Sequence, residues 1–147
     1  MSPFPIFSFF GFFLFDTTTI EWYLIINMNG RIIFYRNDAG HCPFEKFIDR
    51  LPEEDAREVV ASIAALRELG NKARRPLVDY LENGVYELRA RRIKKQFRVL
   101  YSFVGKGKIL ILTGLIKKSK AVPAKEIRKA KTMRMKYLKQ VKGDKNG

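Results

Sequence analysis

Three strand candidates follow one another closely in the second half of the chain, and this run constrains the fold more than any other feature. They are residues 85–90, 96–104 and 108–115, which are rich in β-branched and aromatic side chains. The links between them are short, and the second link contains Gly105 and Gly107. Parallel neighbours would need a crossover connection of about a dozen residues or more. The run therefore predicts an antiparallel meander.

Helix signals lie on both sides of this meander. A short helix is predicted from Pro43, and a longer one begins at Pro52, has acids in its first turn and ends at Gly70. Residues 124–143 form a third helical pattern, and a further strand is predicted at 31–36. This order predicts an α+β fold, in which two N-terminal helices and a C-terminal helix pack against a small antiparallel sheet of about four strands. The apolar stripe of the third helix consists of Ile127, Ala130, Met133, Tyr137 and Val141.

Residues 1–27 differ in composition from the rest of the chain. They are rich in phenylalanine and contain no Lys or Arg. The apolar run 4–15 has about half of the ~20 residues that a membrane-spanning helix needs. The segment also lacks the basic start and the cleavage site of a signal peptide. We therefore expect an atypical extension or a mis-called start, with the working domain at 28–142 and a frayed tail at 143–147. A targeting role, an added strand or a cover for an apolar patch are the alternatives.

The charge of the chain indicates the class of its partner. The 29 Lys and Arg residues outnumber the 15 acids, which gives a net charge of +14 at pH 7. Such an excess favours a polyanionic partner, and the three candidates are a nucleic acid, an anionic membrane surface and an acidic protein. The single cysteine, Cys42, excludes an intrachain disulfide and suits the reducing cytoplasm. Together with the single histidine, His41, it is too little for a zinc site, so we expect neither metal nor cofactor.

Cations crowd onto the first hairpin of the meander. Like charges on paired strands repel each other, so a compensating negative charge is expected, and a partner outside the chain is the favoured source. Strand alternation places Glu87 and Arg89 on one side of the first strand. Arg98 stands between apolar residues in the second strand, so we expect it to contact either a buried carboxylate or an anionic ligand. The hairpin cations are Arg89, Arg91, Arg92, Lys94, Lys95 and Arg98.

Lys117 and Lys118 follow the last strand, and adjacent strands would bring them near Arg98. A solvated basic turn is the alternative interpretation. Clustered Arg and Lys without metal still permit RNA cleavage, because RNA supplies its own nucleophile, the 2′-OH. The protein then has to align that hydroxyl, neutralise the charge on the phosphate and handle protons. Arginine donates two hydrogen bonds to phosphate oxygens, and a lysine crowded by cations gives up its proton more readily.

Several stretches resemble the RelE/HigB-type toxins of bacterial toxin–antitoxin pairs, in the phage-related HigB-like branch. They occur in the family's order over about residues 30–140. The resemblance implies a RelE-like sheet with helices packed on it and a ribosome-dependent mRNA endoribonuclease, or mRNA interferase. It also implies a cognate antitoxin, a helix-turn-helix DNA-binding protein, that masks the toxin. The stretches are PFEKFIDRLP (43–52), PLVDYLENGVYELR (76–89), FRVLY (97–101), ILILTGLIKKSKAVP (109–123) and AKEIRKAKTMRMKYL (124–138).

The resemblance also implies which residues form the site. Arg98 matches the arginine before the V-L-Y stretch, a position tied to phosphate contact and catalysis, and Arg89 matches the arginine of the family's ELR strand. Lys117 and Lys118 fall where relatives place basic residues, and these four residues are the predicted catalytic set. Some relatives use a tyrosine or histidines to activate the 2′-OH, and Tyr137 is an unaligned stand-in here. We expect nucleic-acid contacts from Arg91, Arg92, Lys94, Lys95, Tyr101 and Lys120.

Two other functions stay open for a chain of this fold. ParE-like relatives inhibit DNA gyrase and do not cut RNA. A basic RNA-binding module without catalytic activity is the second alternative. Both would use a basic surface, so the charge of the chain does not separate them from the nuclease.

Overall fold

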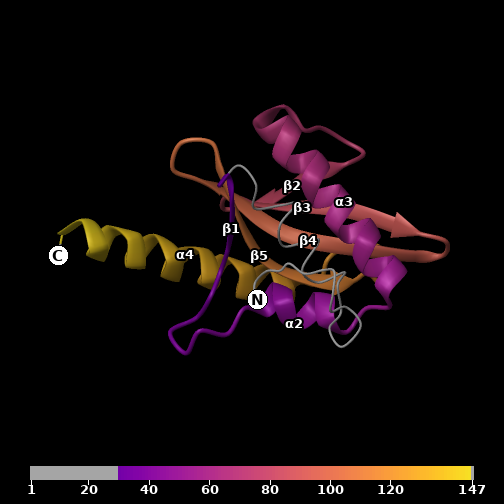
Figure 1. Ribbon diagram of the computed structural model, residues 1–147, viewed down its shortest axis with the longest axis horizontal. Helices are drawn as coiled ribbons and strands as arrows, with labels where there is room; N and C mark the ends of the chain where they lie inside the picture. The colour runs from indigo at the N-terminus through magenta and orange to yellow at the C-terminus, as the bar shows by residue number, and fades with distance from the viewer. Residues whose placement is uncertain (1–29, 147) are drawn as a thin grey trace, which may run out of the picture.

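Residues 30–146, the part of the chain that the computed structural model describes, form one five-stranded sheet with helices on both of its faces (Figure 1). The predicted α+β fold is confirmed. The segment 1–27 and its predicted role lie outside the described residues. The elements are β1 (Ile32–Phe34), α2 (Pro43–Asp49), α3 (Glu53–Leu69), a 3₁₀ turn (Gly70–Lys72), β2 (Val78–Glu82), β3 (Val85–Arg92), β4 (Lys95–Val104), β5 (Lys108–Ile116) and α4 (Ala124–Asn146).

The strand order of the sheet is β1-β5-β4-β3-β2. The strands from β2 to β5 run antiparallel, which confirms the meander, while β1 lies parallel to β5 at the other edge. The expected number of about four strands is corrected to five, because residues 78–82 pair with β3. That strand has only five residues, and the adjacent Tyr80 and Leu81 break the alternation of polar and apolar residues, so its sequence carries only a weak strand signal.

One face of the sheet is covered by α2 and α3. Phe44, Ile63 and Leu66 of these helices are fully buried against Leu88 and Phe97 of the sheet. The acids in the first turn of α3 are favoured there by the helix dipole, as predicted. In β5 the chain needs glycine at position 114, because a Cβ atom there would lie only 2.2 Å from Cδ2 of Phe47. The close approach of α2 to the sheet depends on that missing side chain.

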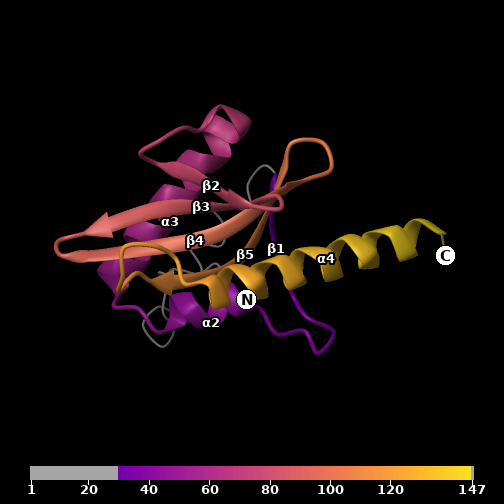
Figure 2. The same ribbon diagram turned by 180° about the vertical axis from the view of Figure 1, so that it is seen from behind.

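The other face of the sheet is covered by α4. Ala130 is fully buried in a second core with Leu100 and Leu112, and Ile127, Met133 and Tyr137 pack against it. Four of the five residues of the predicted apolar stripe therefore form a packing face, and Val141 is not part of that core. The helix continues through Gly143 to Asn146, and its C-terminal half runs past the sheet (Figure 2). Within residues 30–146, none of the helices combines the length and the apolar character needed to cross a membrane.

Candidate functional site

A hollow of about 610 Å³ opens where β3 and β4 meet the segment before β2 and the residue after β5. Register places Arg89 of β3 directly opposite Arg98 of β4, and Arg91 opposite Gln96. The backbone N–H of Lys117 donates to the carbonyl of Gln96 at 2.8 Å, which fixes the lysine at the rim. Three of the four predicted catalytic residues therefore share one hollow. The lining contains no acid and consists of Pro76, Leu77, Arg89, Ala90, Arg91, Gln96, Arg98 and Lys117.

Arg98 is the most enclosed cation of this hollow, with 5% of its surface exposed. Its guanidinium donates to the Phe97 carbonyl at 3.0 Å and to the Gln96 side chain at 3.2 Å. Its Nε lies 2.7 Å from Oε2 of Glu87, close enough for an ion pair but not aligned for a hydrogen bond. Burial lowers the pKa of Arg98, and the charge of Glu87 opposes that shift. We expected Arg98 to contact either a buried carboxylate or an anionic ligand, and Glu87 is such a buried carboxylate.

Glu87 belongs to a chain of alternating charges that crosses three strands. Its Oε2 also accepts a hydrogen bond from Nε of Arg89 at 3.0 Å. Arg89 in turn lies 3.2 Å from Oδ2 of Asp79, which accepts from Arg75 at 2.8 Å. The hydrogen bond from Arg75 lowers the pKa of Asp79. The expectation that a partner outside the chain supplies the compensating charge is therefore wrong for Arg89 and Arg98, because Glu87 and Asp79 of the sheet supply it.

The cations at the tip of the hairpin are anchored to α3. Nζ of Lys95 lies 2.7 Å from one oxygen of Asp55, and Arg92 lies 3.2 Å from the other. Arg92 also pairs with Glu54. The hydrogen bond from Lys95 lowers the pKa of Asp55, although burial of the carboxyl acts in the opposite direction. Arg92 and Lys95, which we predicted as nucleic-acid contacts, thus hold the hairpin tip on the helix.

The remaining predicted site residues, which are the catalytic candidate Lys118 and four predicted contacts, fall into two groups. Arg91, Lys94, Lys118 and Lys120 are exposed, and only Arg91 lines the hollow. Tyr101 is fully buried, with its ring stacked on that of Tyr86 at a centroid distance of 5.4 Å. The prediction that Tyr101 binds nucleic acid is wrong, because no face of its ring is open to a base.

Sequence reasoning missed the residues that complete the site. Gln96 holds both Arg98 and Lys117, and Asp79 comes from the strand that was not recognised. Tyr137, the stand-in for a general base, packs on the α4 side of the core and does not line the hollow. Over residues 30–146, no three His, Cys, Asp or Glu side chains are grouped to hold a metal ion.

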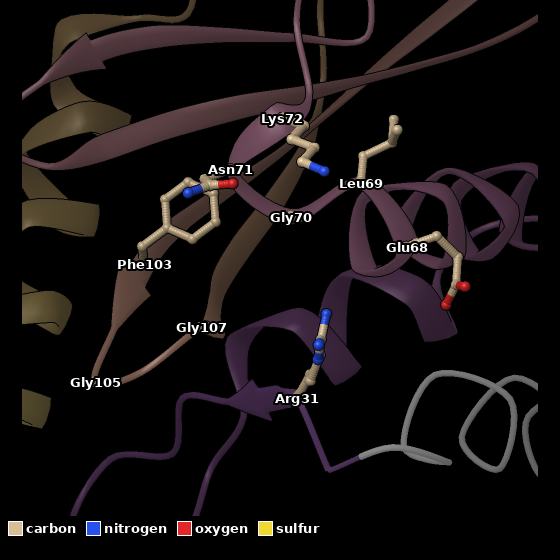
Figure 3. Close-up of a pocket in the computed structure, with 9 residues that line it drawn as sticks. All are labelled: Arg31, Glu68, Leu69, Gly70, Asn71, Lys72, Phe103, Gly105 and Gly107. Atoms are coloured by element: carbon tan, nitrogen blue, oxygen red, sulfur yellow. The ribbon is translucent and has the colours of Figure 1, made fainter.

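A second hollow, of about 530 Å³, lies near the end of β4 that is farther from Arg98 (Figure 3). Arg31 and Lys72 approach it from opposite sides, and the turn between β4 and β5 forms another wall. None of the predicted site residues lines it. Its lining consists of Arg31, Glu68, Leu69, Gly70, Asn71, Lys72, Phe103, Gly105 and Gly107.

Comparison with known proteins places the chain in a family. The phage-derived protein Gp49-like family (DUF891) matches residues 46–136, which is more than half of the chain and includes every residue of the basic hollow. No curated protein matches the chain. The Gp49-like family is part of the RelE/HigB-like superfamily of toxin–antitoxin toxins, which confirms the resemblance at that level. The chain therefore belongs to the phage-derived Gp49-like family of toxin–antitoxin toxins.

Proposed function

We propose that this chain is the toxin of a type II toxin–antitoxin pair and that it cleaves mRNA on the ribosome. The observation that carries the proposal is the basic hollow, which gathers Arg89, Arg91, Arg98 and Lys117 with no acid in its lining. A cavity lined by cations of this kind suits the phosphodiester of RNA, since guanidinium groups donate paired hydrogen bonds to phosphate oxygens. We place the reaction in the cytoplasm, where ribosomes and message meet.

The proposed reaction uses the nucleophile of the substrate. The 2′-oxygen attacks the adjacent phosphorus, the bond from phosphorus to the 5′-oxygen breaks, and a 2′,3′-cyclic phosphate and a 5′-hydroxyl form. A base takes the proton of the 2′-OH as attack begins, and an acid gives a proton to the 5′-oxygen as it departs, so the reaction consumes no net proton. Arg98 and Arg89 would stabilise the negative charge that builds on the phosphate. Lys117 at the rim, or Lys118 beside it, would stabilise charge or move a proton.

In the proposed reaction the phosphate contacts two arginines, Arg89 and Arg98, that already form ion pairs with Glu87. Glu87 contacts Arg98 and Arg89 through the same oxygen, at 2.7 and 3.0 Å. These ion pairs hold the two guanidinium groups side by side, so the site is organised before the substrate arrives. Arg91 and Lys117 supply the positive charge that no described acid neutralises, because no ion pair involves either of them within residues 30–146. The antitoxin is proposed to be an acidic partner that covers this hollow.

The test is induction of the chain in a bacterium, followed by primer extension on abundant messages. We expect growth arrest and new message ends with the native chain. Lys117→Gln and Arg91→Gln should weaken both effects, because each removes a cation from the hollow. Lys106→Gln is the matched control, since it removes an exposed cation from the next turn of the meander, which is not part of the lining. Intact messages in arrested cells would contradict the nuclease.

A test of the catalytic role of Arg98 needs a variant that changes phosphate binding without unfolding the protein. Removal of the arginine would leave Glu87 buried without its partner, which destabilises a fold. Arg98→Lys keeps the charge but loses the planar fork that binds two phosphate oxygens. We expect this variant to fold, as judged by circular dichroism, and to cut messages much less than the native chain does.

A non-catalytic RNA binder is the second candidate, and the pairing of Arg98 with Glu87 favours it. Such a protein would bind RNA with a steep dependence on salt and would leave messages whole even with ribosomes present. A gyrase inhibitor would give a DNA-damage response with intact messages. The induction experiment therefore separates all three functions.

A further inference from the structure

The outward face of α4 carries cations that neither the sheet nor the basic hollow uses. On the side of α4 nearer the sheet, Lys131 pairs with Glu82 at 2.6 Å and Arg134 donates to Ser102 at 2.8 Å. These two cations therefore connect the helix to the sheet. Another set is exposed and has no ion pair among the residues that the structure describes. We name this set the basic ridge, and it consists of Lys125, Arg128, Lys136 and Lys139.

Helix geometry places the ridge residues on one side of α4. At 3.6 residues per turn, all four fall within an arc of about 80°. The buried Ala130 lies roughly opposite the middle of that arc, so the ridge faces away from the sheet. The acids of α4 are Glu126 and Asp144, and both lie about 100° around the helix from Lys125. Glu126 is 3.6 Å from Lys129, which is not a ridge residue. The ridge is therefore free of negative charge.

The ridge is long, straight and close to the basic hollow in sequence. From Lys125 to Lys139 it spans about 21 Å at the helical rise. Lys117 lines the hollow, and Lys118 and Lys120 occupy the loop that leads from it to α4. The helix then runs past the sheet, away from the tip of the β3–β4 hairpin (Figure 2). Exposed cations thus continue from the rim of the hollow along the helix.

We propose that the basic ridge binds the phosphate backbone of double-helical RNA, while the hollow takes the single strand that is cut. The inference deepens the proposed function and rests on it for the choice of RNA and of the ribosome as its source. A row of point charges on a rigid helix suits regularly spaced phosphates. A membrane-surface helix would instead need a broad free apolar face, but four apolar residues of α4 pack in the core and only Met135 and Leu138 are large, apolar and exposed on the described part of the helix.

An acidic protein is less well suited to the ridge. Protein interfaces have an apolar core with aromatic or aliphatic anchors. The ridge residues supply none, and the exposed large apolar side chains of α4, Met135 and Leu138, lie toward one flank. Affinity for the ridge would then come from charge alone, which is the mode of sequence-independent RNA binding.

The test compares two fourfold variants of the full chain. The ridge variant carries K125Q, R128Q, K136Q and K139Q, and glutamine keeps the helix propensity of the residues that it replaces. The control variant carries K46Q, R50Q, K72Q and K106Q, which removes the same charge from exposed positions outside α4 that have no ion pair among residues 30–146. The probe is a short RNA duplex of arbitrary sequence, titrated at several salt concentrations.

We expect the ridge variant to bind the duplex at least tenfold more weakly at low salt. The magnitude of the slope of log affinity against log salt should fall by up to about 3.6, because each of the four lost phosphate contacts removes about 0.9 from it. The control variant should keep most of the native slope. Equal slopes for the two variants would overturn the inference, and so would tighter binding of the native chain to anionic phosphatidylglycerol vesicles than to the duplex.

A second readout separates this inference from the proposed function. Message cleavage with ribosomes is measured for the ridge variant and for Lys117→Gln. If the native chain does not cleave but its ridge binds duplex RNA, the nuclease proposal fails and the ridge stands. If Lys117→Gln loses cleavage while the ridge variant binds the duplex like the native chain, the ridge fails and the nuclease stands.

Discussion

The cations at the base of the β3–β4 hairpin and those at its tip are neutralised in different ways. At the base, Arg98 and Arg89 share a single oxygen of Glu87 within the sheet. At the tip, Arg92 and Lys95 form ion pairs with the two oxygens of Asp55, which belongs to α3. The base lines the basic hollow, while the tip contacts a helix. Paired cations of one hairpin thus line a hollow at one end and anchor a helix at the other.

Among variants of these two clusters, we expect Glu87→Gln to cause the largest loss in the free energy of unfolding. The change leaves two adjacent guanidinium groups without their shared counter-charge, and one of them is buried. Breaking a buried ion pair costs several kcal/mol, so we expect a loss of about 3 kcal/mol in the free energy of unfolding. Chemical denaturation at pH 7 measures it. A loss smaller than that of Asp55→Asn would show that the base is not the more tightly coupled cluster.

A smaller loss is expected from Asp55→Asn. The asparagine keeps the size of the side chain but removes the charge that Lys95 and Arg92 contact. Since the side chain of Lys95 is half exposed, solvent screens part of the interaction, and we expect about 1–2 kcal/mol. Limited proteolysis at the hairpin provides a second measurement, because the tip loses its attachment to α3. Resistance equal to that of the native chain would argue against the anchoring role.

The dependence of stability on pH below 5 provides a further test of the role of Asp55. The pKa of Asp55 is lower in the folded chain than in the unfolded chain. The folded state thus gains stability from the charged carboxylate above the unfolded pKa of about 3.9, and loses it as pH falls through the folded pKa. We expect the free energy of unfolding of Asp55→Asn to fall less between pH 5 and 3 than that of the native chain. Parallel curves would contradict the assignment.

The smallest expected effect is coupling between the two clusters. Glu87 and Asp55 have no ion-pair partner in common among the described residues. The double variant should therefore lose the sum of the two single losses to within about 0.5 kcal/mol. A larger departure from additivity in denaturant titrations would mean that the base and the tip act as one unit.

Much of the fold could be predicted from periodicity, but the partners of the cations could not. The meander and the apolar stripe of α4 follow from local patterns, and alternation alone puts Glu87 beside Arg89. The short edge strand β2 carries little signal, so its Asp79 was not foreseen as a partner of Arg89. Asp55 lies 40 residues before Lys95, and only the packing of α3 on the sheet brings them together. Tyr101 was misplaced because aromatic residues suit both a core and a base-stacking surface.

The central claim is that the hollow cuts RNA by attack of the substrate's own 2′-OH. The most direct measurement uses purified chain, ribosomes and two messages, one of which has a 2′-deoxynucleotide at the scissile position found by primer extension. We predict that the all-ribose message is cut to a 2′,3′-cyclic phosphate and a 5′-hydroxyl, while the deoxy-substituted message stays whole at that position. Equal cutting of both messages, or no cutting of either, would contradict the account.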